Sequence, residues 1–434
     1  MKRSIILLLV LFPIFAFSQM QNIMNQNNSF ATKRSNNNYS VIGITSDLIK
    51  IRSIDQNKLV VSLPYVSLNN TDFIFLVGGT NNVMFSTING VKVYDFQIYN
   101  DTIYFCGKHN SQGCLGWTPV SNLISLNPQL ITLKIINNPI STSIITELEV
   151  YKATHGVSLV AIADNRYLIE LNTAEQNYYQ IIENNTGQFK NIALGSSKIV
   201  AIEHVNDTSF IVAAFDKGYL PNYLYSSFSH PELRYSSYVL ENSLTDTDTF
   251  TLAYTHRKRT INNYYKTDFV TFEVATGINI INNQCLEVYN AKLEPIDLEF
   301  CKEDSALLYL TNGHNGNDEI FQIDPFDTNV YISNSIQPTP HINVGIKQYN
   351  SIIRYDDYFF ATVTKNGASD LIIFDCKRDM NQANCANYFQ EKVQMYNFLT
   401  PTIINTSYTF YIGTQSTLTT TAISTLSSNQ ISCQ

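Results

Sequence analysis

The residues best suited to covalent chemistry are seven cysteines, because thiols form disulfides or bind metal ions. The first six fall into three pairs, whose members are 8, 16 and 9 positions apart. No pair has the two-residue spacing of a zinc knuckle, so we predict disulfides, with zinc as the alternative. The predicted bridges are Cys106 with Cys114, Cys285 with Cys301, and Cys376 with Cys385, whereas Cys433 has no assigned partner.

Other catalytic or cofactor-binding signatures are missing from the sequence. Its seven histidines are scattered, with no two at a close ligand spacing, so we predict no metal site. The chain has no phosphate-binding glycine loop, nucleophile elbow, zincin helix motif or EF-hand loop, so we predict no cofactor and favour a non-enzyme. A carbohydrate-active hydrolase or lyase remains the alternative, because carboxylates from separate strand units can converge on one axis without a linear signature.

An aromatic segment at 218–235 is the best candidate for ligand binding. It interrupts the regular strand pattern with turn-forming residues, so it is expected to form a loop on a rigid scaffold, where binding surfaces are usually built. Flat aromatic rings also stack on sugar rings. The alternative is that these rings fill the space between neighbouring sheets. The candidate ligand-binding residues are Tyr219, Tyr223, Tyr225 and Tyr235.

Short apolar runs that end in a turn dominate the rest of the chain. None keeps a 3.6-residue period for the roughly dozen positions that would indicate a helix. The segments 307–324 and 361–375 each read as strand, Asn-Gly turn and strand, ending in Asp. Asn-Gly adopts the positive φ angles that tight hairpin turns require. The sequence therefore predicts an all-β protein built from antiparallel hairpins.

These hairpins recur about every 50 residues, a period typical of arrays of small sheets. Four strands are expected within 91–137, which is the number in one propeller blade. We predict a β-propeller of about seven four-stranded antiparallel blades, with six or eight blades or a β-solenoid as alternatives. One domain would span 39–434, its ring closed by pairing strands from the two ends of the chain. The predicted complete blades are 91–137, 138–190, 191–242, 243–292, 293–340 and 341–395.

The first 18 residues have the pattern of a cleaved signal peptide. A basic start is followed by an apolar run from Ile5 to Phe17, too short to span a bilayer, and by a small-x-small cleavage site. The Asn- and Gln-rich stretch 19–38 is then expected to be a disordered lead-in. No cysteine follows the apolar run to carry a lipid. We therefore predict a secreted, periplasmic or cell-surface protein without a membrane span.

Composition narrows the choice of partners. Charged residues make up only 15% of the chain, and Tyr and Phe are abundant at 27 and 25 residues, which favours half-buried sheet surfaces. Loss of Lys2 and Arg3 with the signal peptide changes the formal net charge from −8 to −10. An acidic protein is poorly suited to nucleic acid or to an anionic membrane. The expected partner is a glycan or another exported protein.

One stretch carries a resemblance to a known group of proteins. The string from Val91 to Gly107, followed by Gly113 to Trp117, resembles phrases in uncharacterised exported propeller-like proteins of Bacteroidetes. The match covers one blade, and it implies a propeller fold and an exported bacterial protein without implying any chemistry. Taken together, these features predict an exported, non-catalytic binding or interaction protein on a propeller scaffold.

Overall fold

A computed structural model describes the chain over the strands and their nearest connections. The described residues are 39–44, 50–55, 58–65, 70–77, 83–174, 178–244, 246–258, 265–287, 295–301, 306–311, 319–323, 331–332, 335–338, 347–355, 358–365, 368–375, 386–387, 391–392 and 406–427. The predicted signal peptide at 1–18 and lead-in at 19–38 lie outside these residues, so both stay predictions.

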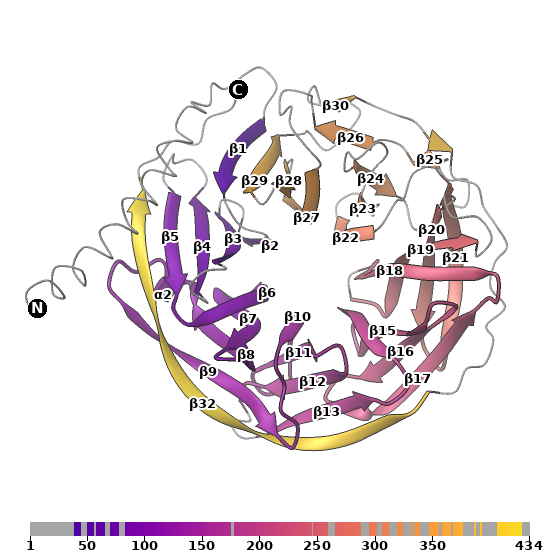
Figure 1. The fold of residues 1–434 in the computed structure, drawn as a ribbon, viewed down its shortest axis with the longest axis horizontal. Coiled ribbons are helices and arrows are strands. Elements are labelled where there is room, and N and C mark those ends of the chain that lie inside the picture. The colour runs from indigo at the N-terminus through magenta and orange to yellow at the C-terminus, as the bar shows by residue number, and fades with distance from the viewer. Residues whose placement is uncertain are drawn as a thin grey trace, which may run out of the picture.

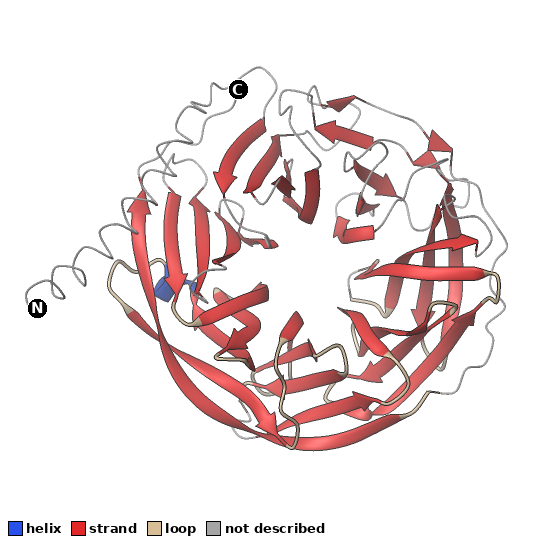
Figure 2. Ribbon diagram, in the orientation of Figure 1, coloured by secondary structure: helices blue, strands red, loops and turns tan. Residues whose placement is uncertain are grey.

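The described strands form a ring of seven antiparallel blades around a central axis, each built on four strands (Figure 1). We number these blades 1 to 7 in chain order. In each blade the first strand lies nearest the axis and the fourth lies at the circumference, except that blade 7 takes its outer strand from the N-terminus. Nearly all of the regular structure is strand (Figure 2). The predicted all-β propeller with seven blades is confirmed.

Blades 1 to 4 are continuous in sequence, and each runs from the axis outward. Their strands are β2 (Lys50–Asp55), β3 (Lys58–Tyr65), β4 (Asn70–Val77) and β5 (Val83–Ile88); β6 (Val91–Tyr99), β7 (Thr102–His109), β8 (Gln112–Pro119) and β9 (Gln129–Asn138); β10 (Ile145–Lys152), β11 (Val157–Ala163), β12 (Tyr167–Asn172) and β13 (Tyr178–Asn184); and β14 (Gln188–Leu194), β15 (Lys198–Asn206), β16 (Ser209–Asp216) and β17 (Tyr219–Ser229).

Blades 5 to 7 complete the ring, and short strands pair at its edge. Blade 5 contains β18 (Leu233–Asn242), β19 (Thr249–Lys258), β20 (Tyr265–Val274) and β21 (Ile278–Glu287); blade 6 contains β22 (Pro295–Cys301), β23 (Ala306–Thr311), β24 (Glu319–Ile323) and β26 (Ser335–Pro338), extended by β30 (Ala386–Asn387); blade 7 contains β27 (Lys347–Tyr355), β28 (Tyr358–Lys365), β29 (Ala368–Asp375) and β1 (Tyr39–Ile44); and β25 (Tyr331–Ile332) pairs with β31 (Glu391–Lys392).

Tight hairpins join the strands where the sequence supplies residues that tolerate positive φ. Asp164 and Asn165 have φ of 50° and 54° in the turn between β11 and β12. Two consecutive positive φ angles match the right-handed twist of the flanking strands. Asn100 and Asp101 form the equivalent turn between β6 and β7, with φ of 48° and 54°. These turns fix local strand order, which is why the recurring hairpin was visible in the sequence.

The hydrophobic core is divided into separate layers between neighbouring blades. One cluster lies between blades 3 and 4 and includes Ile162, Phe189 and Phe215. The middle strands are covered on both faces, so β16 has every residue buried except its last. Such strands read as continuous apolar runs rather than as alternating ones. This explains why the hairpins predicted at 307–324 and 361–375 correspond to the second and third strands of blades 6 and 7.

In the part of the chain that the structure describes, the N-terminal strand completes the last blade of the ring. β1 pairs antiparallel with β29, from Tyr39 opposite Phe374 to Ile44 opposite Ser369, and so completes blade 7. This pairing joins a strand from the N-terminal part of the chain to one from its C-terminal part. The C-terminal strand does pair with β5, which belongs to the N-terminal part of the chain, but it does so at the circumference.

That C-terminal strand, β32 (Tyr408–Ser427), forms a belt around three blades (Figure 1). It pairs antiparallel with β13, then with β9, then with β5, and so links blades 3, 2 and 1 into one continuous sheet of 13 strands. Buried Glu203 of blade 4 holds its start, accepting hydrogen bonds from the hydroxyls of Thr406 at 3.0 Å and Tyr408 at 2.8 Å. The belt thus covers the outer edges of blades 1 to 3.

Near the axis, neighbouring blades are joined by polar side chains that follow a β-bulge. In blades 2, 3 and 4 the register between the first and second strands shifts next to Asp95, Glu147 and Asn191. Each of these side chains accepts a hydrogen bond from a backbone N–H of the next inner strand. The bonds run from Leu148 N to Asp95 Oδ2 at 3.1 Å, from Ile192 N to Glu147 Oε2 at 3.1 Å, and from Leu240 N to Asn191 Oδ1 at 2.5 Å.

The single helix in the described part of the chain is α2 (Val120–Leu123), which has four residues. No helix there has the length and apolar character needed to cross a membrane.

Candidate functional site

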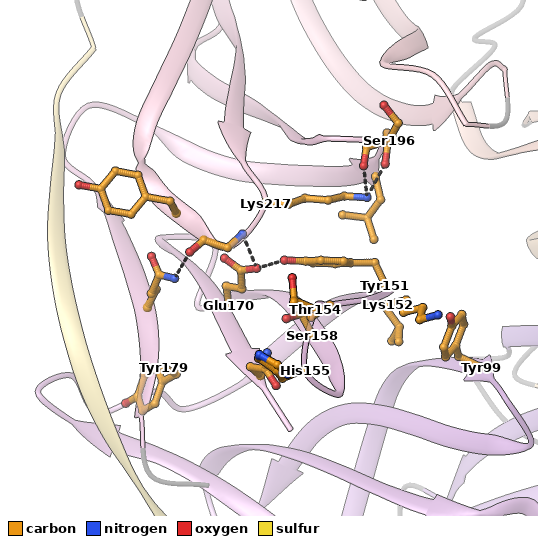
Figure 3. Close-up of a pocket in the computed structure, with 18 of the residues that line it drawn as sticks. Tyr99, Tyr151, Lys152, Thr154, His155, Ser158, Glu170, Tyr179, Ser196 and Lys217 are labelled. Atoms are coloured by element: carbon orange, nitrogen blue, oxygen red, sulfur yellow. Dashed lines mark hydrogen bonds between the residues drawn. The ribbon is translucent and has the colours of Figure 1, made fainter. Parts of the chain in front are cut away.

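A cleft of about 1430 Å³ opens on one face of the ring, mainly between blades 3 and 4. Its walls come from the β10–β11, β14–β15 and β16–β17 turns, with contributions from β12, β13, the β18–β19 turn of blade 5 and the belt (Figure 3). At its inner end Tyr99 and Lys152 stand at the ends of inner strands. At its outer end Phe410 and Ile412 project from the belt. The cleft therefore runs from the axis side of the ring toward the circumference.

The floor of the cleft is a set of hydrogen bonds centred on Glu170 of β12. Glu170 is 4% exposed, and its Oε1 accepts from the Tyr151 hydroxyl and from Gly218 N at 3.0 Å (Figure 3). Burial and the adjacent Glu170 carboxylate raise the pKa of Tyr151, so this phenol stays protonated as the donor. Glu170 therefore fixes the β16–β17 turn of blade 4 onto blade 3.

Lys217 forms one side of the same floor. Its ammonium donates to the carbonyl oxygens of Gly195 and Ser196 and lies 4.6 Å from the centre of the Tyr151 ring. Burial lowers the pKa of Lys217, and nearby carboxylates of Asp248, Glu149 and Glu170 oppose that shift. These contacts hold the β14–β15 and β16–β17 turns together, which is a positioning role.

Gln180 of β13 connects the floor to the outer end. Its amide donates to Gly218 O at 2.8 Å and accepts from Leu220 N at 3.2 Å. This two-point contact fixes the start of β17 against β13. As a result, Tyr219, between the two contacted residues, is directed into solvent and is 61% exposed.

The outer end of the cleft is apolar and exposed. Phe410 and Ile412 of the belt are 37% and 65% exposed, and they face the cleft together with Tyr219. Phe410 pairs in register with Ile182 and Ile412 with Gln180, so both side chains lie on the face of blade 3 that is turned toward blade 4. Exposed apolar groups gathered in a concave site mark a place for another molecule.

The carboxyl groups of the cleft differ in how available they are for chemistry. A glycoside hydrolase needs a pair of available carboxyl groups on either side of the scissile bond. Three carboxylates line the cleft. Glu170 is buried and engaged with Tyr151 and Gly218, whereas Glu241 is half-buried and Asp246 is exposed. Within the described residues, no group of three or more His, Cys, Asp or Glu side chains could hold a metal ion.

The structure separates the four tyrosines that the sequence singled out. The segment predicted as a loop is instead two strands, β17 and β18, joined by three residues. Tyr219 lines the cleft, whereas Tyr223 and Tyr225 continue along β17 beside it, with their rings 6.5 Å apart. Tyr223 also packs against Tyr408 of the belt, at 4.9 Å between ring centres. Only Tyr219 among the four faces the cleft.

Tyr235 does not belong to a ligand site. It is 3% exposed in the core between blades 4 and 5, where its ring packs against Phe210 and Tyr254 at 5.1 and 5.7 Å. Its assignment as a ligand-binding residue is therefore wrong. The alternative interpretation, in which rings fill the space between sheets, holds for this residue.

The predicted bridge between Cys106 and Cys114 is also wrong, because both thiols are free and buried. Cys106 pairs with Leu115 and Cys114 with Gly107, so the two side chains point to opposite faces of blade 2. Cys106 lies in the core shared with blade 3 and Cys114 in the core shared with blade 1. Burial raises the pKa of Cys114 to about 12. The side chains of Cys285 and Cys301, and residues Cys376, Cys385 and Cys433, lie outside the described part of the molecule.

Several residues of the cleft were missed by reasoning from the sequence. Phe410 and Ile412 alternate along β32, which indicates a strand but does not indicate which blade it joins. Tyr151 lies near the end of β10, Glu170 within β12 and Lys217 in the β16–β17 turn, and no motif marks them. The only usable signal in the sequence was the density of aromatic residues in the segment 218–235.

Sequence comparisons assign this chain to no family. No protein-family model matches the chain, and no curated protein matches its sequence. Among solved structures it is similar to the β-propeller domain of Cps50 (Swd1) from Myceliophteria thermophila, with 7% identity, a TM-score of 0.48, and coverage of 77% of this chain and 99% of that one.

A second similar structure is a chain of a mitotic checkpoint complex, with 9% identity, a TM-score of 0.47, and coverage of 80% of this chain and 96% of that one. A third is a prolyl endopeptidase, with 8% identity, a TM-score of 0.39, and coverage of 78% and 50%. Such values transfer no activity or partner. The propeller part of the predicted resemblance is confirmed by the ring itself, whereas its bacterial and exported parts stay predictions.

Proposed function

We propose that this protein is a non-catalytic binding protein that holds an extended segment of a partner protein in the cleft between blades 3 and 4. The observation that carries the proposal is the exposed apolar outer end, formed by Tyr219, Phe410 and Ile412. Covering these side chains with a ligand would remove apolar surface from water, which favours association. The engaged floor of Glu170 and Lys217 supplies a rigid base rather than reacting groups.

A protein segment suits this end better than a glycan does. Tyr219 and Phe410 could stack on sugar rings, but Ile412 is the most exposed of the three and offers neither a flat π face nor a hydrogen bond. An aliphatic side chain is matched by the apolar side chains of a polypeptide. We further propose that the protein acts outside the cytoplasm after removal of 1–18, since the first residues have the pattern of a signal peptide.

Selection from a random peptide library displayed on phage, using the intact mature protein as bait, tests the proposed ligand class. Selected peptides should lose about tenfold in affinity with Ile412→Ser, because burial of one such side chain contributes on the order of 1.5 kcal/mol or more. Ile423→Ser is the matched control, since Ile423 is exposed on the same belt strand but does not line the cleft.

Two results would overturn the proposal. One is a set of peptides whose affinity is unchanged by Ile412→Ser. The other is a glycan array with hits that Tyr219→Ala abolishes, combined with no enriched peptide. The second result would instead support the glycan ligand expected from the aromatic residues.

A further inference from the structure

Some charged side chains of the cleft are already engaged within the protein. Hydrogen bonds to neighbouring residues hold both Glu170 and Lys217. The carboxylates of Asp248, Glu149 and Glu170 also lie close enough to act on the charge of Lys217. The charges on the floor of the cleft are therefore compensated internally, and they leave little for a partner to recognise.

Two other charged residues of the cleft, Lys152 and Asp246, face solvent. Both line the cleft, and both are exposed. Among the residues that the structure describes, neither side chain forms a hydrogen bond or an ion pair with another. A charged group from a partner can therefore pair with either side chain without breaking a contact inside the protein.

These two residues stand on turns of different blades. Lys152 is the last residue of β10, at the turn to β11 in blade 3, and Asp246 lies in the turn between β18 and β19 of blade 5. The equivalent turn of blade 4, which lies between them in the ring, contributes the small residues Gly195 and Ser196 to the cleft. A segment that lies across blade 4 therefore has a positive charge on one side and a negative charge on the other.

The sequence around each turn has the same sign of charge. The blade 3 turn at 152–157 contains His155 and no carboxylate, whereas the blade 5 turn at 241–248 contains three carboxylates and no Lys or Arg. One of the three, Asp248, accepts hydrogen bonds from backbone N–H groups of blade 4. The exposed negative charge on the blade 5 side is therefore that of Asp246.

We infer that the partner segment carries an acidic side chain that pairs with Lys152 and a basic side chain that pairs with Asp246, besides the apolar side chain that covers Ile412. This inference rests on the proposed function, because it concerns the same segment in the same cleft. The apolar contact supplies most of the affinity, since an exposed ion pair contributes little. The two charges instead fix the direction of the segment, because a reversed segment would bring like charges together.

Charge reversal with a complementary peptide tests the pairing at Lys152. The probe is a peptide from the phage selection whose affinity for the intact mature protein depends on Ile412. Lys152→Glu should weaken this peptide about fivefold in calorimetric titrations, because a repulsion replaces an attraction. The same peptide with its acidic residue changed to Lys should recover the affinity on Lys152→Glu. Recovery would also show that the variant is folded.

Neutralisation tests the pairing at Asp246. This residue has a φ of 63°, a backbone conformation that Asn adopts more readily than Lys does. Asp246→Asn should weaken the peptide about twofold, and changing the basic residue of the peptide to Gln should then have no further effect. Lys190→Glu and Asp207→Asn are matched controls, since neither residue lines the cleft, and both should leave the affinity unchanged.

Salt provides a test without further variants of the peptide. Raising NaCl from about 0.05 M to about 0.5 M should weaken binding to the wild-type protein, because salt screens exposed charges. The same increase should strengthen binding of the original peptide to Lys152→Glu, where the interaction is repulsive.

Failure of this inference differs from failure of the proposed function. A peptide that is lost with Ile412→Ser, yet is insensitive to Lys152→Glu, Asp246→Asn and salt, would overturn the charge pairing and leave the cleft as the binding site. A loss with Lys152→Glu that the reversed peptide does not restore would also overturn the pairing. Absence of any peptide sensitive to Ile412→Ser would overturn both proposals.

Discussion

Blades are joined in two different ways at the inside and the outside of the ring. Near the axis, Asp95, Glu147 and Asn191 each contact the next inner strand, only 53, 45 and 49 residues further along the chain. At the circumference, the belt contacts blades that lie hundreds of residues away in sequence, as in the bond from Asn89 to Thr421 across 332 residues.

This difference shows that the ring and the belt are separate structural layers. The inner joints repeat from blade to blade and need only neighbouring segments, which come together at a low cost in chain entropy. The belt pairs with the outer strands of blades 1 to 3, and it also supplies Phe410 and Ile412 to the cleft. Stability of the belt and shape of the candidate binding site are therefore coupled.

The largest expected effect is at the start of the belt. Tyr408 packs against Phe189, Phe215 and Tyr223, with ring centres 6.0, 5.5 and 4.9 Å away. Tyr408→Ala should lower the free energy of unfolding by about 3 kcal/mol, as for other large aromatic side chains removed from a core. Urea unfolding measures the change. Ile423→Ala on the same strand is the control, and an equal loss in both variants would contradict a specific anchor at Tyr408.

A smaller loss is expected from the carboxylate beneath this anchor. Glu203 is fully buried and accepts from the hydroxyls of Thr186, Thr406 and Tyr408. Glu203→Gln keeps the shape but replaces one accepting oxygen by a donor, so it should cost about 2 kcal/mol. Thermal unfolding should show the shift, and Glu203→Gln combined with Tyr408→Phe should cost less than the two changes added together. Strict additivity would contradict a direct interaction.

The hydrogen bonds of Glu147, which join blades 3 and 4 near the axis, should contribute less to the free energy of unfolding. Glu147 is half-buried and accepts from Ile192 N at 3.1 Å and from the Asn191 amide at 2.9 Å. Glu147→Ala should lower the free energy of unfolding by about 1 kcal/mol, the usual net value of such bonds. If chemical denaturation showed a loss larger than that of Tyr408→Ala, the inner joints rather than the belt would dominate cohesion between blades 3 and 4.

The smallest expected effect is a pH dependence of stability that arises from Asp248, whose carboxylate joins blades 4 and 5. Asp248 accepts from Ser197 N at 2.9 Å and Lys198 N at 3.0 Å. Burial tends to raise the pKa of Asp248, but the hydrogen bonds from Ser197 and Lys198 leave it below its ordinary value of 3.8. The stabilisation is therefore present above about pH 4 and is lost as the pH falls through the lower, folded-state pKa.

Urea titrations between about pH 5 and pH 2.5 should show this loss in the wild-type protein. Asp248→Asn should reduce the decline of the free energy of unfolding at low pH. An identical decline in both proteins would exclude Asp248 as a source of acid sensitivity.

Much of the strand content was predictable because it depends on neighbouring residues. The predicted blade at 91–137 matches β6 to β9, where tight turns at Asn100 and Asn110 define the hairpins. The predicted blade at 191–242 was shifted, because β18 (Leu233–Asn242) belongs to blade 5. The connection from β17 to β18 has only three residues, as short as a hairpin turn, so spacing alone cannot reveal that the chain has changed sheets.

The roles of individual residues were less predictable where they depend on which face of a sheet the side chain occupies. Tyr219 and Tyr235 lie in one aromatic segment, yet one is exposed in the cleft and the other is buried between blades 4 and 5. Cys106 and Cys114 are near in sequence but face opposite sides of blade 2. A shift of one position in register reverses the face that a side chain occupies.

By itself, therefore, the sequence determined an all-β chain of repeated antiparallel hairpins, because alternation and turn chemistry act over a few residues. Only the tertiary structure decided that β1 closes the ring, that β32 encircles three blades, and that Ile412 meets Tyr219 in one cleft. These contacts join strands that are distant in the chain. They are set by the fit of sheet edges and packed faces, for which a local pattern contains no signal.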